Sequence, residues 1–334
     1  MVGLRLFLPE SWTDDPERMT RAGVPLDRQR ALTKPEIAIE EIDRIIASGA
    51  RFGCVLADAG YGSSGPFRQA LSERGLLWAV GLSRRQTVYP AAVGLIFPVA
   101  KTGRRRQDHV PDQPPVSAEA MLSGERWRKI SWRRGTKGRL TCLFAARRVR
   151  IAEGHKHRMQ GNRMQCMPGD EVWLVGERRS TGEQKYDVSN FPADATLKML
   201  AAAIKARWIC EQAHQQLKEE LGLDHFEGRS WTGLHRHALM TMVAYAFLQS
   251  RRLKAAGRKK KNRGTAAATQ HASDQTGHSQ PVRAAPNPTM PALWKAPYRS
   301  GRSACTKVMP GWPPLTNVLR MEQYLYQGLK IVTR

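Results

Sequence analysis

The sequence has few cysteines, and their spacing does not suit a small stabilised domain. Cys54, Cys142, Cys166, Cys210 and Cys305 are scattered, odd in number and without a C-x-x-C pair. This pattern argues against a disulfide framework and against a structural zinc site. Reduced thiols in a cytoplasmic protein are the simplest interpretation.

Long apolar runs are also missing. The longest candidate for a membrane segment, residues 91–100, is far too short to span a bilayer and contains Pro98. The N-terminus lacks the apolar region of a secretory signal. Hydrophobic residues make up 41% of the 334 residues, which is low for a compact globule and indicates that part of the chain does not fold. We expect neither membrane insertion nor secretion.

Acidic residues are scarce, with 29 Asp and Glu against 54 Lys and Arg, so the formal net charge is +25. Residues 251–334 carry 16 basic and 2 acidic residues (16 − 2 = +14), and the first 250 residues carry the rest (38 − 27 = +11). Such an excess favours a polyanionic partner, because each neutralised phosphate releases counterions. A basic tail alone would produce much of this excess, so charge by itself does not identify a nucleic acid.

The residue pattern divides the chain into four segments. Residues 1–83 alternate expected strands (4–8, 54–57, 78–82) with expected helices (34–48, 67–74), which predicts an α/β core. Residues 84–190 are rich in Gly, Pro and Arg and predict a β-rich insertion, with strands at 129–132, 140–145, 171–175 and 185–188. Residues 191–253 return to helical periodicity, at 194–221 and 234–253. Residues 254–334 form a disordered basic tail, since apolar periodicity ends there; read-through or a frameshift explains the tail better than a DNA-binding role.

Asp58 is the first candidate for chemistry. It follows the buried strand expected at 54–57, at the carboxyl end where α/β sheets place their ligands. A turn aspartate that accepts hydrogen bonds from the following amides is the structural alternative.

A second candidate group lies on the helix expected at 194–221. Arg207, Glu211, His214 and Lys218 fall at about 0°, 40°, −20° and 20° around a helix, so they share one narrow face. One carboxylate within a basic stripe fits a metal ligand flanked by cations that hold DNA phosphates. A solvated face held by side-chain pairs is the alternative, although Arg207 before Glu211 is the poorer order for an i,i+4 ion pair.

Two motifs far apart in the chain carry a family resemblance. Arg207-x3-Glu211-x6-Lys218 matches three positions of a Y-x2-R-x3-E-x6-K signature, and the stretches 56–62 (LADAGYG), 221–231 (LGLDHFEGRSW) and 233–235 (GLH) accompany it. Over residues 4–253 the chain resembles one branch of bacterial insertion-sequence transposases of the DDE, ribonuclease-H-like kind. The resemblance implies a ribonuclease-H-like core with a β-rich insertion, Asp58 as the second catalytic aspartate and Glu211 as the catalytic glutamate.

The chain departs from this branch at two places. Ile204 stands where the signature has tyrosine. The first catalytic aspartate should lie upstream of residues 4–8, where the sequence has no counterpart, so we expect an N-terminally truncated copy whose core is incomplete at its N-terminus. Little or no strand transfer is expected from such a chain.

The resemblance also implies the reaction and its partners. Three carboxylates can hold two Mg²⁺ ions about 4 Å apart, with Mn²⁺ as a substitute, to cleave DNA and transfer strands. The expected partners are double-stranded DNA, as element ends and target, and a second copy of the chain in a DNA-bound homodimer. Arg207, His214 and Lys218 would then bind DNA phosphates.

A basic hairpin is expected within the insertion. Residues 127–139 combine two tryptophans with six cations around a glycine-rich turn, and Arg133, Arg134 and Lys137 are candidates for phosphate contacts. Packing of Trp127 or Trp132 inside the protein is the favoured alternative to base stacking.

For the whole chain, two other hypotheses compete with transposition: a non-catalytic basic nucleic-acid-binding protein and a structure-specific nuclease.

Overall fold

The computed structural model describes residues 4–97, 109–135, 138–158, 164–269 and 330–332. The chain divides into two compact units, Met1–Met242 with Glu322–Arg334, and Val243–Met321. The sheet, its helices and the pocket discussed below belong to the first unit. The described residues of the second unit, 243–269, are the later part of one long helix, α9.

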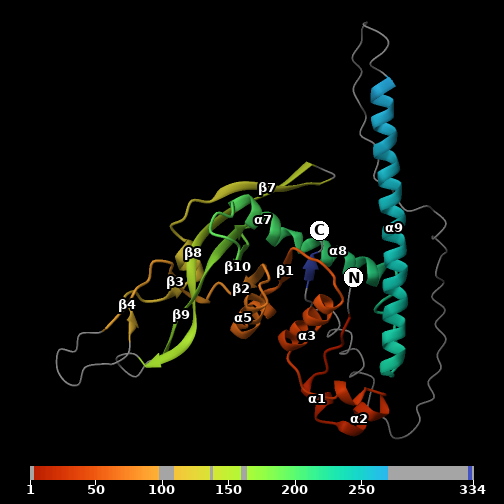
Figure 1. The fold of residues 1–334 in the computed structure, drawn as a ribbon, viewed down its shortest axis with the longest axis horizontal. Coiled ribbons are helices and arrows are strands. Elements are labelled where there is room, and N and C mark those ends of the chain that lie inside the picture. The colour runs from red at the N-terminus through yellow and green to blue at the C-terminus, as the bar shows by residue number, and fades with distance from the viewer. Residues whose placement is uncertain (1–3, 98–108, 136–137, 159–163, 270–329, 333–334) are drawn as a thin grey trace. The chain divides into compact units, whose positions relative to one another are not determined.

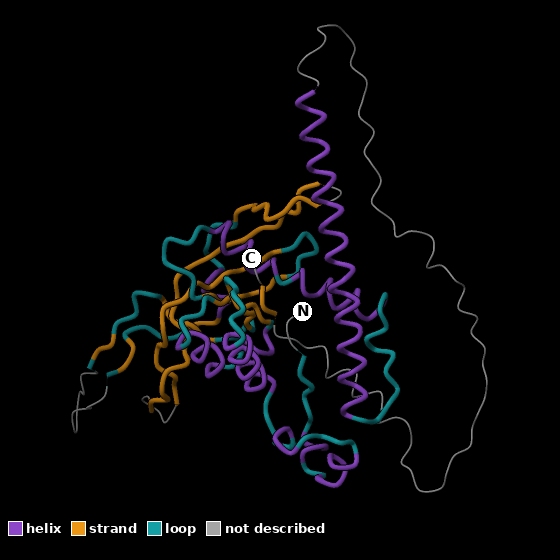
Figure 2. Tube along the Cα trace, turned by 45° about the vertical axis from the view of Figure 1, so that its right-hand side comes forward, coloured by secondary structure: helices purple, strands orange, loops and turns teal. Residues whose placement is uncertain are grey.

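A mixed sheet forms the centre of the first unit (Figures 1 and 2). Its strand order is β11-β1-β2-β10-β9-β8-β3-β6, and β7 pairs with β8 beside this path. Strands β1 and β2 are parallel, and the other described pairs are antiparallel. The strands are β1 (Cys54–Ala57), β2 (Trp78–Leu82), β3 (Thr87–Pro90), β6 (Val116–Ser117), β7 (Arg128–Gly135), β8 (Gly138–Arg158), β9 (Met164–Arg178), β10 (Gln184–Ser189) and β11 (Lys330–Val332), with β4 (Leu95–Ile96) and β5 (Val110–Pro111) in a separate pair.

The described helices differ widely in length. They are α1 (Glu10–Thr13), α2 (Pro16–Arg21), α3 (Lys34–Ala47), α4 (Ala59–Gly62), α5 (Gly65–Glu73), α6 (Ala118–Leu122), α7 (Leu197–Ala206), α8 (Trp208–Glu219) and α9 (Trp231–Thr269), with a 3₁₀ turn at Leu26–Arg28. Within the described residues, none of these helices combines the length and the apolar character needed to cross a membrane.

Helix α3 forms where the sequence predicts it, because its start carries a complete capping box. The Thr33 hydroxyl accepts a hydrogen bond from the Glu36 amide (3.4 Å), and the Glu36 carboxylate accepts one from the Thr33 amide (2.7 Å). Pro35 lies in the first turn, where its missing N–H has no partner to lose. Ile42 and Ile45 then bury one face of the helix.

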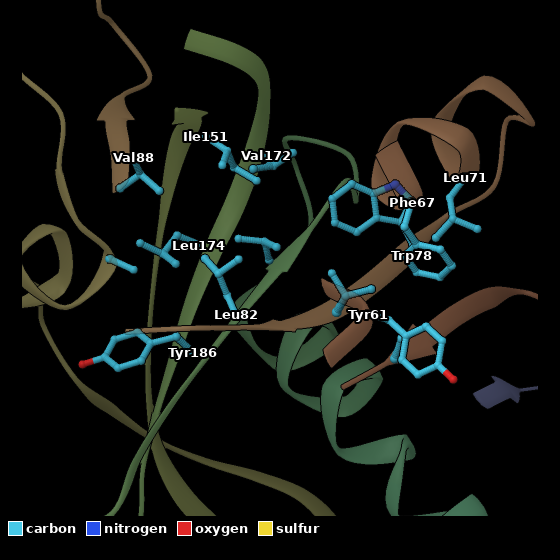
Figure 3. Packing of buried hydrophobic residues seen from close by; sticks show 14 of the residues in the cluster. Tyr61, Phe67, Leu71, Trp78, Leu82, Val88, Ile151, Val172, Leu174 and Tyr186 are labelled. Atoms are coloured by element: carbon cyan, nitrogen blue, oxygen red, sulfur yellow. The ribbon is translucent and has the colours of Figure 1, made fainter. Parts of the chain in front are cut away.

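Two hydrophobic clusters lie on opposite faces of the sheet, as alternation along the strands requires. The larger cluster joins side chains of β1, β2, β3, β8, β9 and β10 to α3, α5 and α6 (Figure 3). On the other face, Leu56 and Ala79 pack with Leu200, Ala201 and Ile204 of α7. Helices therefore cover both faces, and the mixed α/β architecture expected for a ribonuclease-H-like core is confirmed.

The β-rich segment expected between residues 84 and 190 continues the same sheet. Strand β10 pairs antiparallel with β2 through Val188 and Val80, and β9 and β8 follow in order. Val88, Ile151 and Val172 of this segment belong to the larger cluster together with Val55 of β1. The segment therefore shares the core of the first 83 residues, and it also contains a small cluster of its own, formed by Tyr89, Val93 and Ala152.

The strand expected at residues 4–8 is wrong. Leu6 and Leu8 are buried in alternation, as the pattern required, but residues 4–9 are not in a strand. Alternating burial can be met by an extended segment that packs on neighbours, whereas a strand also needs a second backbone to bond. No described strand pairs with this segment.

The single helix expected at 194–221 is interrupted at Arg207. There the amide of Arg207 bonds to the carbonyl of Ile204 (3.4 Å) and the amide of Cys210 to that of Arg207 (3.1 Å), which is the tighter i→i−3 pattern. Helix α7 ends before this residue and α8 begins after it. Ile209, in the first turn of α8, is 54% exposed.

The expected low-order tail, 254–334, lies largely outside the described residues. In the part that is described, α9 continues from Trp231 to Thr269, and β11 pairs antiparallel with β1. The three pairs are Cys54 with Val332, Val55 with Ile331 and Leu56 with Lys330. Strand β11 thereby bonds the edge of β1 that faces away from β2.

The turn after β1 is pressed against β2 by two glycines. A Cβ atom on Gly62 would lie 1.9 Å from the Gly81 carbonyl oxygen, and one on Gly81 would lie 2.7 Å from the Ala59 amide nitrogen. Buried Arg68 adds to this contact by donating to the Gly62 carbonyl and pairing with Glu153 of β8. These contacts hold the backbone after Asp58 in place against β2.

Substitution of Gly62 should be costly for this reason. Gly62→Ala is expected to lower the free energy of unfolding by about 3 kcal/mol, because the new methyl group must displace backbone. Gly124→Ala is the matched control, since a Cβ at Gly124 meets nothing within 4 Å. Urea denaturation followed by circular dichroism measures both, and equal midpoints for the two variants would contradict the close contact.

Candidate active site

A pocket of about 740 Å³ lies beside the ends of β1 and β2. Strands β7, β9 and β10 and the junction of α7 with α8 complete its wall, and these elements are neighbours in Figure 1. Four acidic residues line it together with six cations and three aromatic rings. They are Asp58, Glu177, Asp187 and Glu211; Arg84, Arg133, Arg179, Lys185, Lys205 and Arg207; and Trp132, Tyr186 and Trp208.

Asp58 occupies the position expected from the sequence, directly after β1, and it lines the pocket. Its Oδ1 atom accepts a hydrogen bond from the Gly60 amide (2.9 Å), which caps the short helix α4. Both structural interpretations of this residue therefore apply. Asp58 caps a turn, and it also faces a pocket at the end of β1.

Glu211 lines the same pocket from the first turn of α8. Its Oε1 atom lies 3.5 Å from Nη2 of Arg207, so the two form an i,i+4 ion pair despite the less favourable order. Both side chains retain contact with solvent, 27% for Arg207 and 48% for Glu211, so this pair contributes little to stability.

Asp58 and Glu211 are separated by 153 positions in the chain and are brought to one pocket by the fold. The other two residues of the expected stripe are not. His214 and Lys218 lie further along α8, half-buried, and are not among the residues that line the pocket. The pocket reaches only the first turn of α8, and His214 and Lys218 lie in later turns of the same helix.

The basic hairpin contributes to the pocket through Arg133. The Arg133 guanidinium stacks over the ring of Trp208, 3.9 Å from its centre, and both line the pocket. Arg134 belongs to β7, but its side chain lies outside the described residues, as does Lys137 altogether. Trp127 packs against the larger hydrophobic cluster, which is the alternative favoured over base stacking.

A buried ion-pair network on the pocket wall was missed by the sequence analysis. Glu177 accepts a hydrogen bond from Lys205 (2.6 Å) and one from Arg179 (3.0 Å). Burial alone would raise the pKa of Glu177, but the bonds from Lys205 and Arg179 outweigh it and lower that pKa. Lys205 also lies over the ring of Trp132, 4.8 Å from its centre. Alternation along β9 places Glu177 on the face of Val175, but sequence gives no signal that α7 delivers Lys205 there.

Asp187 was also missed, because it lies within a short strand whose other residues are ordinary for a sheet. Its carboxyl group makes no hydrogen bond or ion pair with any described residue, although it lines the pocket. Burial raises the pKa of Asp187 to about 7; Arg207 and Lys205 oppose this rise, and Glu177 adds to it. The pocket therefore contains one carboxyl group that the protein leaves without a direct partner.

The donor chemistry of the pocket suits a hard divalent cation, since carboxylate oxygens are the ligands that Mg²⁺ and Mn²⁺ prefer. Across the described residues, however, no three acidic, histidine or cysteine side chains stand close enough together to hold a metal ion. The oxygen donors face one pocket and are spread around its wall.

Comparison with known families agrees with the resemblance noted above. Residues 1–139 match the family described as DDE superfamily endonuclease. The matched part contains β1, Asp58, the α4 turn and Arg133, and ends before Glu211. The match supports the DDE-type resemblance over these residues. No curated protein matched the chain.

The raised pKa of Asp187 makes the stability of the protein depend on pH. Because the folded protein holds this proton up to about pH 7 and the unfolded chain releases it near its ordinary pKa of 3.8, stability falls as pH rises between these values. Asp187→Asn, which has no proton to lose, should therefore be more stable than the wild type at pH 8, by about 1–3 kcal/mol, and similar to it at pH 4. Thermal unfolding at both pH values measures this, with exposed Asp194→Asn as control; a wild-type advantage at pH 8 would refute it.

Proposed function

We propose that this DDE-type chain is a DNA transposase, or a copy of one with reduced catalytic power. The observation that supports the proposal best is that Asp58 and Glu211 line one pocket among cations. In this proposal Asp58 and Glu211 are the catalytic carboxylates, and the substrates are the ends of an insertion element and a target duplex. The chain would cut the first and join it to the second.

The cations of the pocket would position the DNA backbone. Arg133 is held by stacking on Trp208, so little side-chain entropy is lost when it binds a phosphate. Arg207, which also lines the pocket, is held only weakly by Glu211, at 3.5 Å. It can exchange this partner for a phosphate. Arg84 and Lys185 add two further positive charges to the wall. His214 and Lys218 would extend the contact along α8, outside the pocket.

Asp58 and Glu211 are also the residues that would hold a divalent cation, Mg²⁺ or Mn²⁺. Such an ion, when bound, supplies activation of a water or a DNA 3′-hydroxyl and stabilisation of the leaving oxygen. In this proposal Asp58 and Glu211 would hold the ion, and Arg133 and Arg207 would offset the repulsion between these carboxylates and DNA. Because the donors are dispersed around the pocket, strand transfer by this chain should be weak.

A non-catalytic role in nucleic-acid binding is the second candidate. It is favoured by the excess of cations over carboxylates in the pocket, six against four, and by the direct partners that Glu211 and Glu177 already have. A surface of this kind can hold a phosphate backbone without a metal ion. The transposase needs the carboxylates of Asp58 and Glu211 for DNA cleavage, whereas a non-catalytic DNA-binding protein does not need them.

A nicking assay separates them. Purified protein with supercoiled plasmid and Mn²⁺ should give slow, cation-dependent nicking, and Asp58→Asn and Glu211→Gln should each reduce its rate by at least about a hundredfold, because neither amide can replace a metal-binding carboxylate. DNA affinity, measured by fluorescence anisotropy, should stay the same or rise, because a negative charge is removed. DNA binding without any nicking, or nicking that both variants retain, would favour the non-catalytic alternative or a contaminating nuclease.

The salt dependence of DNA binding tests the basic hairpin. Reversing Arg133, Arg134 and Lys137 together to Glu should reduce the slope of log affinity against log salt by about 2–3, since each lost phosphate contact removes roughly 0.9 from it. The control reverses Arg21, Arg51 and Lys198, three exposed cations that do not line the pocket. If both triple variants keep the wild-type slope, the hairpin does not contact phosphates.

A further inference from the structure

Strand β1 is buried on both faces, although it lies next to the end of the strand order. Val55 and Ala57 belong to the larger hydrophobic cluster and Leu56 to the cluster on the α7 face, and none of the three is more than 1% exposed. A short apolar strand of this kind is typical of a sheet interior, where both edges of the strand are bonded. The edge of β1 that faces away from β2, called the outer edge below, therefore needs a bonding partner.

The backbone groups of the outer edge follow from one hydrogen bond. The Val55 amide donates to the carbonyl of Leu77 (2.8 Å), so the amide and carbonyl of Val55 point towards β2. Successive residues of a strand direct these groups to opposite edges, so those of Cys54 and Leu56 point to the outer edge. Buried backbone groups without a partner are costly, and an open edge is a template for another strand.

Strand β11 meets this edge in the matching register. It is the dark blue arrow beside the C mark in Figure 1, and it runs antiparallel to β1. Val332 lies opposite Cys54, and Lys330 lies opposite Leu56. In an antiparallel ladder these are the pairs that exchange both backbone bonds, whereas Ile331, between them, directs its amide and carbonyl away from β1.

This pairing depends on the backbone of the incoming segment. Residues 331–333 are Ile-Val-Thr, three β-branched residues that favour an extended chain. Along the chain, the whole second unit, Val243–Met321, separates this segment from the first 242 residues. Loop-closure entropy rises only slowly with length, so a distant segment can reach the edge and can also leave it while the sheet stays folded. Affinity through main-chain bonds is characteristic of recognition by strand addition.

We propose that the outer edge of β1 is a strand-acceptor site and that Lys330–Val332 of the same chain is its ligand. The site takes an extended, β-branched peptide segment that runs antiparallel to β1 and bonds the backbone of Cys54 and Leu56. Because β1 leads directly into Asp58, occupation of the site orders the strand that places this carboxylate. The site consists of β1 backbone and does not depend on the reaction proposed above.

Amide hydrogen exchange in the full chain, resolved by residue with NMR, tests the site. Lys330→Pro combined with Val332→Pro removes both donors that face β1, and should speed exchange of the Leu56 amide by about tenfold or more. The Val55 amide, bonded to Leu77, is the internal reference and should change less. Ile331→Pro is the matched control, because its lost N–H faces away from β1 and edge strands tolerate such a proline.

A fluorescein-labelled peptide of residues 327–334 tests whether the edge accepts a strand in trans. Fluorescence anisotropy should show binding to the full-length double-proline variant, whose edge is free, at least about tenfold tighter than to the wild type, whose own segment competes. N-methylation of the peptide at Lys330 and Val332 should abolish binding, and N-methylation at Ile331 should preserve it, because only the first two amides face β1.

Three results would overturn the proposal. The wild type alone can do so, if its Leu56 amide exchanges as fast as that of an exposed residue, and this readout does not require any variant to fold. Peptide binding that is the same for both N-methylated forms would show that the backbone of β1 is not the site. A wild-type dimer in light scattering that the double-proline variant loses would show that a second copy supplies the strand, against the assignment to the same chain.

Discussion

The direct contact between the backbones of Gly62 and Gly81 is the constraint on which the pocket depends. It brings the turn after β1 against β2 so closely that neither position has room for a side chain. Asp58, at the start of this turn, is thereby placed at the end of the sheet and level with Gly81. Arg68 and Glu153 reinforce the same turn from the buried side, so the position of Asp58 is linked to β8 as well as to β2.

The carboxylates of the pocket differ in how firmly they are paired with cations. Glu177 is buried and fully engaged, Glu211 is paired loosely near solvent, and Asp187 has no direct partner among the described residues. Buried pairs of charges hold geometry, whereas loose and unpaired ones can accept a new partner. The pocket thus combines a rigid wall, built on Glu177 and Lys205, with two carboxylates able to respond to a ligand.

Much of the α/β core could be predicted from local signals. The helix expected at 34–48 and the strand expected at 54–57 match α3 and β1 closely, because both depend on neighbouring residues. The prediction at residues 4–8 was wrong, since alternation reports burial and not the presence of a pairing strand. The break at Arg207 was missed because its i→i−3 bonds depend on how α7 packs, not on a proline or glycine in the sequence.

The sequence by itself determined the DDE-type resemblance, the α/β class and the identity of Asp58 and Glu211 as candidate acids, because these follow from motifs and local periodicity. Only the tertiary structure decided which charged residues meet. Strand register brought Asp187 level with Asp58, and the α7–α8 junction brought Lys205 and Arg207 to the same pocket. Side chains on separate strands and helices become neighbours through pairing and packing, and no local pattern along the chain encodes those distances.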